Sequence, residues 1–164
     1  MTSLRIGVVM DPLPQVHPDK DTTFALMLEA QKRGHELAYH NHSFEFQKFD
    51  GKYGLDIIYE NTAPHLVVAE IDVYWVKHGN VDPAEYVNKL GDRVRLLHLK
   101  DMGQGPEKRF APVGTGVIDF KPILAAAEKH GIRWGIVEQD STYGAPPLEQ
   151  IKTSLANLKK LGAV

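Results

Sequence analysis

The chain has 164 residues, of which 43% are hydrophobic and 24% charged, and its formal net charge at pH 7 is −2. These values are typical of one globular domain with a buried core, and the charge balance argues against a nucleic-acid partner. The absence of cysteine excludes disulfide bonds, thiol nucleophiles and thiolate metal ligands.

The sequence also predicts where the protein resides. No apolar run reaches the roughly 18 residues that are needed to cross a bilayer, so we expect no membrane partner. The first residues lead directly into a strand-like run and lack the apolar core and the small-residue cleavage site of a signal peptide. Together with the absence of cysteine, these features predict a cytoplasmic protein.

Short apolar runs and helix-like segments alternate along the chain. The runs with the composition of buried strands are residues 4–10, 37–42, 66–73, 94–101 and 134–138. The segments with the spacing or the end signals of helices are residues 21–34, 55–60, 82–91, 119–131 and 148–161. This repeated βα pattern predicts a single α/β domain, residues 1–164, built on a five-stranded parallel sheet.

Individual residues mark the ends of these elements. Asp21 is placed to cap the first helix. Asp82 gives the clearest helix start, because a capping aspartate is followed three positions later by Glu85. Asp50 and Gly51 form a pair that is typical of a tight turn.

Polar side chains stand at the ends of three predicted strands. The third strand ends with Glu70 and Asp72, the fourth with His98 and Lys100, and the fifth with Glu138. Residues two apart in a strand point to the same face. Because parallel α/β proteins keep their sites at the carboxyl ends of the strands, we expect these side chains to lie close together.

From about residue 36 onward, six ordered motifs carry a family resemblance. They are YHNHSFEF at 39–46, ENT at 60–62, DVYW at 72–75, HLKD at 98–101, GTGVIDF at 114–120 and VEQD at 137–140. In this order they resemble the C-terminal half of a sugar phosphate isomerase/epimerase of the xylose-isomerase-like TIM-barrel superfamily.

The first 35 or so residues resemble a different family. GVVMDP at 7–12 and KDTTFALMLEAQKRGHEL at 20–37 are similar to the start of a bacterial glutathione synthetase, a βα unit that precedes the ATP-grasp fold. Nothing in the chain resembles the ATP-grasp portion, so we expect no ATP or other nucleotide cofactor. The two resemblances meet near residues 34–37 and predict a recombined or engineered chimera. The alternative is a generic βα unit whose likeness is accidental.

The isomerase resemblance implies a divalent metal site with four ligands at the carboxyl ends of the strands. Asp72, His98 and Glu138 match three of the four ligand positions. Carboxylate oxygens together with imidazole suit Mn²⁺, Mg²⁺, Co²⁺ or Zn²⁺. For each residue taken alone, a helix cap or a solvated strand end is the simpler interpretation.

The first ligand position departs from the family pattern. Many relatives have glutamate there, whereas His40 holds the position by strand register, with His42 and Glu45 as the alternatives. If His40 is the ligand, one carboxylate of an acid/base pair has been replaced. This substitution weakens the case for proton transfer more than the case for metal binding.

Other residues are candidates for contact with a substrate. Glu138 is the candidate catalytic acid or base if the protein is active. Lys100 can reach a substrate oxygen, and Trp75 can form a wall for a sugar, although a solvated strand end and core packing are the simpler interpretations. Asp101 and Asp140 are expected to cap the chain as it leaves the sheet.

The number of strands limits the architecture. Five strands cannot close a barrel whose geometry needs about eight. Either the sheet is open and doubly wound, as in flavodoxin-like or Rossmann-like folds, with the first strand between the second and third, or it is half-barrel-like. Two half-barrel copies could then form a homodimer. Either arrangement removes substrate contacts, so we expect a chimera with little or no turnover. A metal-dependent sugar isomerase or epimerase is the alternative.

Overall fold

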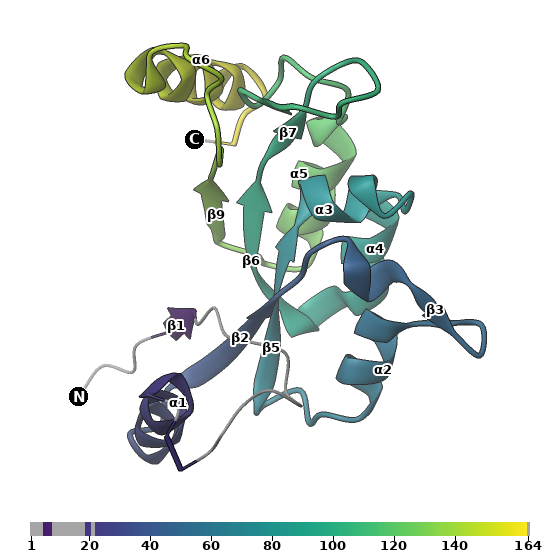
Figure 1. The fold of residues 1–164 in the computed structure, drawn as a ribbon, viewed down its shortest axis with the longest axis vertical. Coiled ribbons are helices and arrows are strands. Elements are labelled where there is room, and N and C mark those ends of the chain that lie inside the picture. The colour runs from purple at the N-terminus through teal and green to yellow at the C-terminus, as the bar shows by residue number, and fades with distance from the viewer. Residues whose placement is uncertain (1–4, 8–18, 21, 164) are drawn as a thin grey trace.

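The structure, a computed structural model, describes residues 5–7, 19–20 and 22–163. Its main sheet has five parallel strands in the order β1-β2-β5-β6-β9 (Figure 1). These strands are β1 (Arg5–Gly7), β2 (Glu36–His40), β5 (Val67–Asp72), β6 (Val94–Leu99) and β9 (Trp134–Val137). The predicted parallel sheet is therefore present, and within the described residues β1 and β9 are its edges.

A helix follows each strand of this sheet. The helices are α1 (Thr22–Lys32), α2 (Gly54–Glu60), α3 (Val73–His78), α4 (Pro83–Leu90), α5 (Phe120–Lys129) and α6 (Pro147–Lys160). All five predicted helical segments are present, whereas α3 was not predicted. The expected cap Asp21 and part of the first predicted strand lie outside the described residues. No helix among the described residues combines the length and the apolar character needed to cross a membrane.

Two small hairpins extend from this framework. The first pairs β3 (Lys48–Phe49) with β4 (Lys52–Tyr53) across the predicted turn, where Asp50 and Gly51 both have positive φ angles of 50° and 87°. The second pairs β7 (Asp101–Met102) with β8 (Phe110–Ala111). It was not predicted, because strands of two residues carry no periodic signal.

The strands are arranged in the same order in space as in the sequence. A doubly wound sheet would place β1 between β2 and β5, but among the residues that the structure describes β1 pairs with β2 alone, at the edge. The positions of the helices explain the difference. One face of the sheet carries apolar side chains such as Ile71 and Leu97, which join the helices in the core, while the face of Glu70 and His98 also carries the apolar Leu96 and Ile136. The helices α2, α3, α4 and α5 lie on one side of the sheet, whereas a doubly wound sheet carries crossover helices on both faces.

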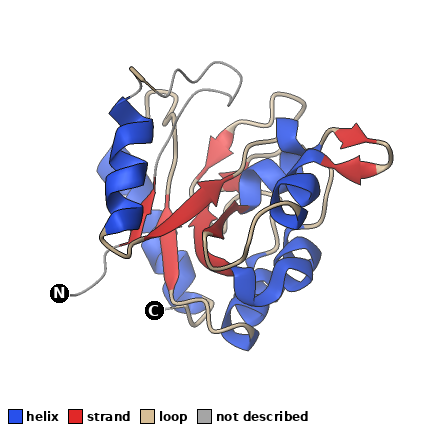
Figure 2. Ribbon diagram, turned by 90° about the horizontal axis from the view of Figure 1, so that it is seen from below, coloured by secondary structure: helices blue, strands red, loops and turns tan. Residues whose placement is uncertain are grey.

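The helices α2, α3, α4 and α5 gather on one side of the sheet (Figure 1), and Figure 2 shows the strands in the middle of the molecule. Contacts of α3 with α4 and of α4 with α5 make this layer continuous. Buried side chains such as Val87 and Ile123 connect it to Ala69 and Leu99 of the sheet. This core leaves the carboxyl ends of the strands free to carry polar groups.

One buried carboxylate organises the loop at residues 102–118. Asp101 accepts hydrogen bonds from the backbone N–H groups of Met102, Gly114, Gly116 and Ile118 at 2.7 to 3.2 Å. A Cβ atom on Gly116 would lie 2.1 Å from the carbonyl oxygen of Met102, which explains the glycine. Asp101 therefore binds the backbone as the chain leaves the sheet, and the amide groups of the glycine-rich loop are engaged by this carboxylate.

Candidate metal centre

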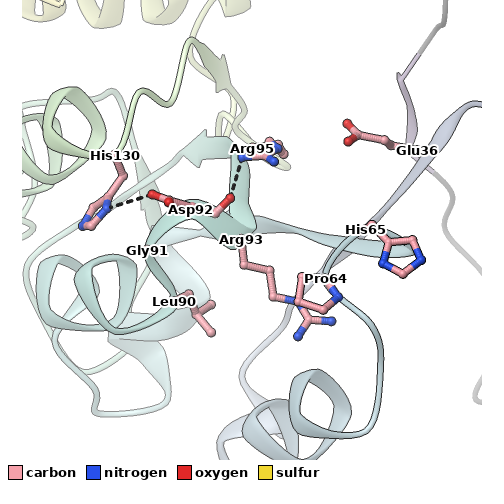
Figure 3. Close-up of a pocket in the computed structure, with 9 residues that line it drawn as sticks. All are labelled: Glu36, Pro64, His65, Leu90, Gly91, Asp92, Arg93, Arg95 and His130. Atoms are coloured by element: carbon pink, nitrogen blue, oxygen red, sulfur yellow. Dashed lines mark hydrogen bonds and ion pairs between the residues drawn. The ribbon is translucent and has the colours of Figure 1, made fainter.

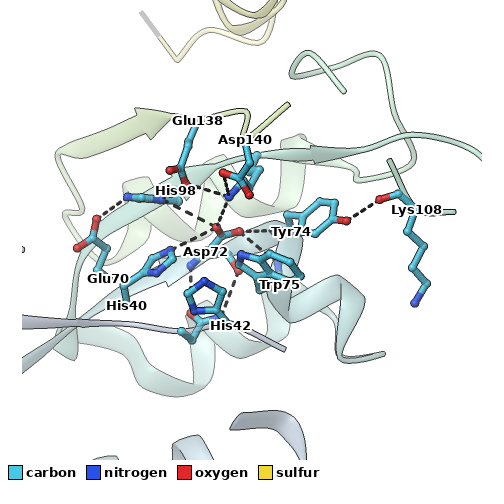
Figure 4. Close-up of polar contacts among 12 residues, drawn as sticks. His40, His42, Glu70, Asp72, Tyr74, Trp75, His98, Lys108, Glu138 and Asp140 are labelled. Carbon is cyan, nitrogen blue, oxygen red and sulfur yellow. Dashed lines mark hydrogen bonds and ion pairs between the residues drawn. The ribbon is translucent and has the colours of Figure 1, made fainter. Parts of the chain in front are cut away.

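Four side chains from four strand ends converge at the carboxyl edge of the sheet (Figure 4). They are His40, Asp72, His98 and Glu138, and one ligand atom from each lies within 4.8 Å of all the others. The strand register brings them together, because Asp72 pairs with His98, and His98 pairs with Ile136, two residues before Glu138. These are the four residues that the sequence and its resemblance nominated as metal ligands.

Asp72 divides its carboxylate between a structural role and the cluster. Its Oδ1 caps helix α3 by accepting hydrogen bonds from the backbone N–H groups of Tyr74 and Trp75. Its Oδ2 lies 3.3 Å from Nε2 of His40 and 3.9 Å from Nδ1 of His98. The cap fixes the carboxylate, and its other oxygen faces the two histidines and Lys100. The completely buried Asp72 therefore holds an oriented donor atom at the centre of the cluster.

The backbone of Asp72 is held by a second residue. The Asp72 N–H donates to Oδ1 of Asn41 at 3.0 Å, and Nδ2 of Asn41 donates to the Asp72 carbonyl oxygen at 3.4 Å. Asn41 is itself completely buried. This reciprocal pair ties the residue after β2 to the end of β5, so His40 and Asp72 keep their relative positions.

His98 lies between two carboxylates. Its Nε2 is 2.6 Å from Oε1 of Glu70, and its Nδ1 is 2.9 Å from Oε2 of Glu138. Burial acts to lower the pKa of His98, but the hydrogen bonds and charges of Glu70 and Glu138 outweigh it and raise that pKa. The two carboxylates engage opposite nitrogens of the ring, so they fix its orientation.

Lys100 brings a positive charge to the same edge. Its Nζ lies 2.8 Å from Oδ1 of Asp140, 3.0 Å from Oε2 of Glu138 and 3.5 Å from Oδ2 of Asp72. The side chain is only 2% exposed, and these carboxylates outweigh burial to raise the pKa of Lys100. The nearby cations Lys100 and His98 in turn outweigh burial and lower the pKa of Glu138. The lysine is therefore a buried counter-ion and not a solvated strand end. Asp140, expected as a cap, pairs with it.

Trp75 lies beside this lysine. Its ring centroid is 5.6 Å from Nζ of Lys100 and 5.2 Å from the centroid of the His42 ring. Its indole Nε1 is buried and has no hydrogen-bond partner among the described residues. Trp75 therefore packs at the rim of the cluster, and its N–H donor is available there.

The two alternatives for the first ligand position are used differently. Glu45 is buried, and it accepts hydrogen bonds from the Tyr39 hydroxyl at 2.9 Å and from the backbone N–H of His42 at 3.0 Å. The His42 ring packs edge-on against His40, and burial lowers the pKa of His42. Neither residue belongs to the group of four, which contains His40.

The sequence named Glu70 as a strand-end acid but gave it no role. In the structure it is 6% exposed and contacts His98. The signal that could have assigned it is its spacing, because Glu70 stands two residues before Asp72 and so shares its face of β5.

A hollow of about 690 Å³ lies at the opposite ends of the strands (Figure 3). Its charged lining is already engaged: Arg93 donates hydrogen bonds to the backbone oxygens of Tyr59, Thr62 and Val67. These contacts hold helix α2 to the start of β5. Arg93 in this hollow therefore stabilises the fold, and the hollow is remote from the four clustered side chains.

Comparison with known proteins supports the resemblance of the N-terminal segment to glutathione synthetase. Residues 4–52 match the family of the prokaryotic glutathione synthetase N-terminal domain. A glutathione synthetase of Xanthomonas campestris is 60% identical over 37 residues, which are 23% of this chain and 12% of that protein. The Salmonella typhimurium enzyme is 53% identical over 36 residues, 22% of this chain and 11% of that protein.

The whole structure resembles a different group of proteins. A sugar phosphate isomerase/epimerase from Parabacteroides distasonis is 31% identical, with a TM-score of 0.68 over 79% of this chain and 46% of its own. A xylose isomerase domain protein from Planctomyces limnophilus is 18% identical, with a TM-score of 0.66 over 97% of this chain and 58% of its own. The chain thus spans about half the length of these relatives and about a tenth of the glutathione synthetases.

The two likenesses overlap along the sequence, because the family match extends to residue 52 and the likeness to the Planctomyces structure covers 97% of the chain. The N-terminal segment matches the glutathione synthetase N-terminal domain, while the structure resembles xylose-isomerase-like TIM-barrel proteins. The relatives at lower identity, including a D-tagatose 3-epimerase-like protein at 16% with a TM-score of 0.61, support the fold alone.

Proposed function

We propose that this chain is a recombined protein that binds one divalent metal ion through His40, Asp72, His98 and Glu138. The observation that carries the proposal is the convergence of four ligand atoms within 4.8 Å at the carboxyl edge of a barrel-like sheet. Recombination is supported by the match of residues 4–52 to a family different from that of the structural relatives.

The donor set fits such an ion. Two ligands on opposite sides of a divalent ion are about 4 to 5 Å apart, twice the usual metal–ligand distance. Two imidazole nitrogens with two carboxylate oxygens suit Mn²⁺, Co²⁺ or Zn²⁺, and they suit Mg²⁺ less well because it prefers oxygen ligands. When bound, the ion would supply a Lewis acid that polarises a carbonyl group.

We expect little or no turnover from this centre. His40 stands where many of the resembled isomerases carry glutamate, which leaves Glu138 without a second carboxylate in the acid/base pair. The five-stranded sheet is also open, whereas a closed barrel has about eight strands. Catalysis depends on positioning of the substrate, and both differences reduce the groups that would position it.

A metal-dependent sugar isomerase or epimerase is the second candidate. It is favoured by the indole N–H of Trp75, which is buried without a partner among the described residues and can donate to a ligand oxygen. Lys100 would hold Glu138 ionised, as the 3.0 Å contact indicates, so that this carboxylate can accept a proton.

Isothermal titration calorimetry of Mn²⁺ into chelator-treated protein tests the metal site. We expect wild type to bind one ion and Asp72→Ala/His98→Ala to bind none. The matched control is Asp92→Ala/His130→Ala, which removes another Asp–His pair, 3.5 Å apart and remote from the cluster. Equal binding by wild type and the Asp72/His98 variant, or no binding by wild type, would contradict the proposal.

A screen of keto-sugars tests the second candidate. Epimerisation that requires the metal and is lost in Glu138→Gln would favour the isomerase over the inactive chimera. The absence of turnover in metal-loaded wild type would leave metal binding as the function of the site.

A further inference from the structure

We propose that Glu70 is a positioning residue that holds the His98 ring with Nδ1 toward the metal. The inference rests on the proposed metal site and deepens it, because it assigns which nitrogen of His98 coordinates and what fixes that choice.

The two ring nitrogens of His98 have different neighbours. Nδ1 faces the other ligands, at 2.9 Å from Oε2 of Glu138 and 3.9 Å from Oδ2 of Asp72. Nε2 faces away from them and lies 2.6 Å from Oε1 of Glu70. Only Nδ1 can therefore join the cluster without rotation of the ring, and Nε2–H is left to donate to Glu70.

The sheet places Glu70 for this contact. Glu70 pairs with Leu96 across the β5–β6 ladder, and His98 lies two residues beyond Leu96 on the same face. Such diagonal neighbours are within reach of long side chains. An irregularity in the ladder between Ala69 and Glu70 sets this register. The contact is therefore built into the pairing of the two strands.

Burial makes the contact with His98 energetically important. The Glu70 side chain is only 8% exposed, and a buried carboxylate is costly unless it is paired and hydrogen-bonded. In the described part of the chain, His98 is the cationic group that it meets within ion-pair distance. A histidine that binds a metal commonly donates its other N–H to a carboxylate, which fixes the tautomer and the ring orientation.

Removal of such a partner typically reduces metal affinity by roughly 10- to 100-fold. We therefore expect Glu70→Ala to bind Mn²⁺ that much more weakly than wild type in calorimetric titration. Glu70→Gln keeps a side-chain oxygen that can accept the N–H of Nε2, so it should recover most of the affinity. The control is Asp56→Ala, which removes a largely buried acid that pairs with Lys89 and Tyr86. It should bind like wild type.

A second readout reports the ring directly. In Zn²⁺-loaded protein labelled with ¹⁵N-histidine, the His98 spectrum should show a metal-bound Nδ1 and a protonated Nε2. In metal-free wild type, the Nε2 proton shared with Glu70 should give a downfield signal that Glu70→Ala lacks. Neither signal would change if Glu70 served only the stability of the fold.

The outcomes separate this inference from the proposed function. Wild type that binds no metal overturns the function, while the metal-free spectrum still tests the Glu70–His98 contact. Wild-type binding with unchanged affinity and an unchanged His98 spectrum in Glu70→Ala overturns the positioning role and leaves the metal site standing. Coordination through Nε2 would overturn it as well.

Discussion

Lys100 is buried beside two of the four residues of the candidate metal centre. Its side chain is 2% exposed, and its ammonium group meets Asp72, Glu138 and Asp140. Its Nζ lies 3.0 Å from Glu138 and 3.5 Å from Asp72, two carboxylates that would hold the ion. The lysine and the ion therefore act on the same two ligands, and the stability of the fold should report on both.

Replacing Lys100 with methionine tests this relation. In metal-free protein we expect the free energy of unfolding to fall by about 3 kcal/mol, the lower end for breaking a buried ion pair, since Glu138 and Asp140 are partly exposed. With saturating Mn²⁺ the loss should be smaller, because the ion supplies the missing charge. Urea denaturation with and without Mn²⁺ measures both values.

The control for this variant is Lys89→Met. Lys89 pairs with Asp56 at 2.6 Å but is 53% exposed, so its removal should cost about 1 kcal/mol or less. An equal loss for Lys100→Met in the presence and absence of metal would show that the ion does not replace the lysine charge.

At the level of elements, three aspartates begin three helices. Asp72 caps α3, Asp82 caps α4 and Asp119 caps α5, each by accepting backbone hydrogen bonds with its side chain. The cap at Asp82 was predicted from its spacing to Glu85, because that signal is local. A cap was one of the simpler interpretations of Asp72, but the helix that it caps was not predicted, since β5 passes directly into α3.

Asp82→Ala isolates the contribution of a cap that is remote from the candidate site. Asp82 accepts from the Glu85 N–H at 2.8 Å, and its loss should lower the free energy of unfolding by about 1 kcal/mol. Asp82→Asn should lose little, because asparagine is an equally good cap. Chemical denaturation measures both variants, and equal losses would show that the charge matters more than the hydrogen bond.

At the scale of the whole molecule, the edge strand β9 of the main sheet carries exposed apolar side chains. Within the described residues β9 pairs only with β6, and its side chains are exposed: Trp134 at 60%, Ile136 at 40% and Val137 at 37%. An open edge strand with exposed apolar side chains is a template for pairing with another chain. Because the chain spans 46% of the Parabacteroides barrel, two copies would carry about as many strands as one barrel.

We therefore predict that the chain forms a homodimer through the β9 edge. Light scattering coupled to size-exclusion chromatography should give twice the monomer mass for wild type and the monomer mass for Trp134→Lys. Phe49→Lys, which replaces an exposed aromatic side chain in the β3–β4 hairpin, should remain dimeric. A monomeric wild type at micromolar concentration would contradict this prediction.

Strands, helices and the identity of the clustered residues were accessible from sequence. Periods of two and 3.6 residues are local properties, and parallel strands necessarily bring their carboxyl ends to one edge. For this reason the polar side chains at three strand ends could be placed together before the fold was known, and the resemblance to the isomerases selected Asp72, His98 and Glu138 among them. His40 was nominated by register, although His42 and Glu45 remained open.

The sequential order of the strands, the pairing of Glu70 with His98 and the burial of Lys100 among three acids were decided only by the tertiary structure. Each depends on side chains that come from different strands, such as Lys100 and Glu138, 38 residues apart. No local pattern records which strand lies beside which, or toward which neighbour a ring nitrogen turns. The sequence by itself determined the elements and the candidate ligands, whereas their mutual geometry arose from packing between distant segments.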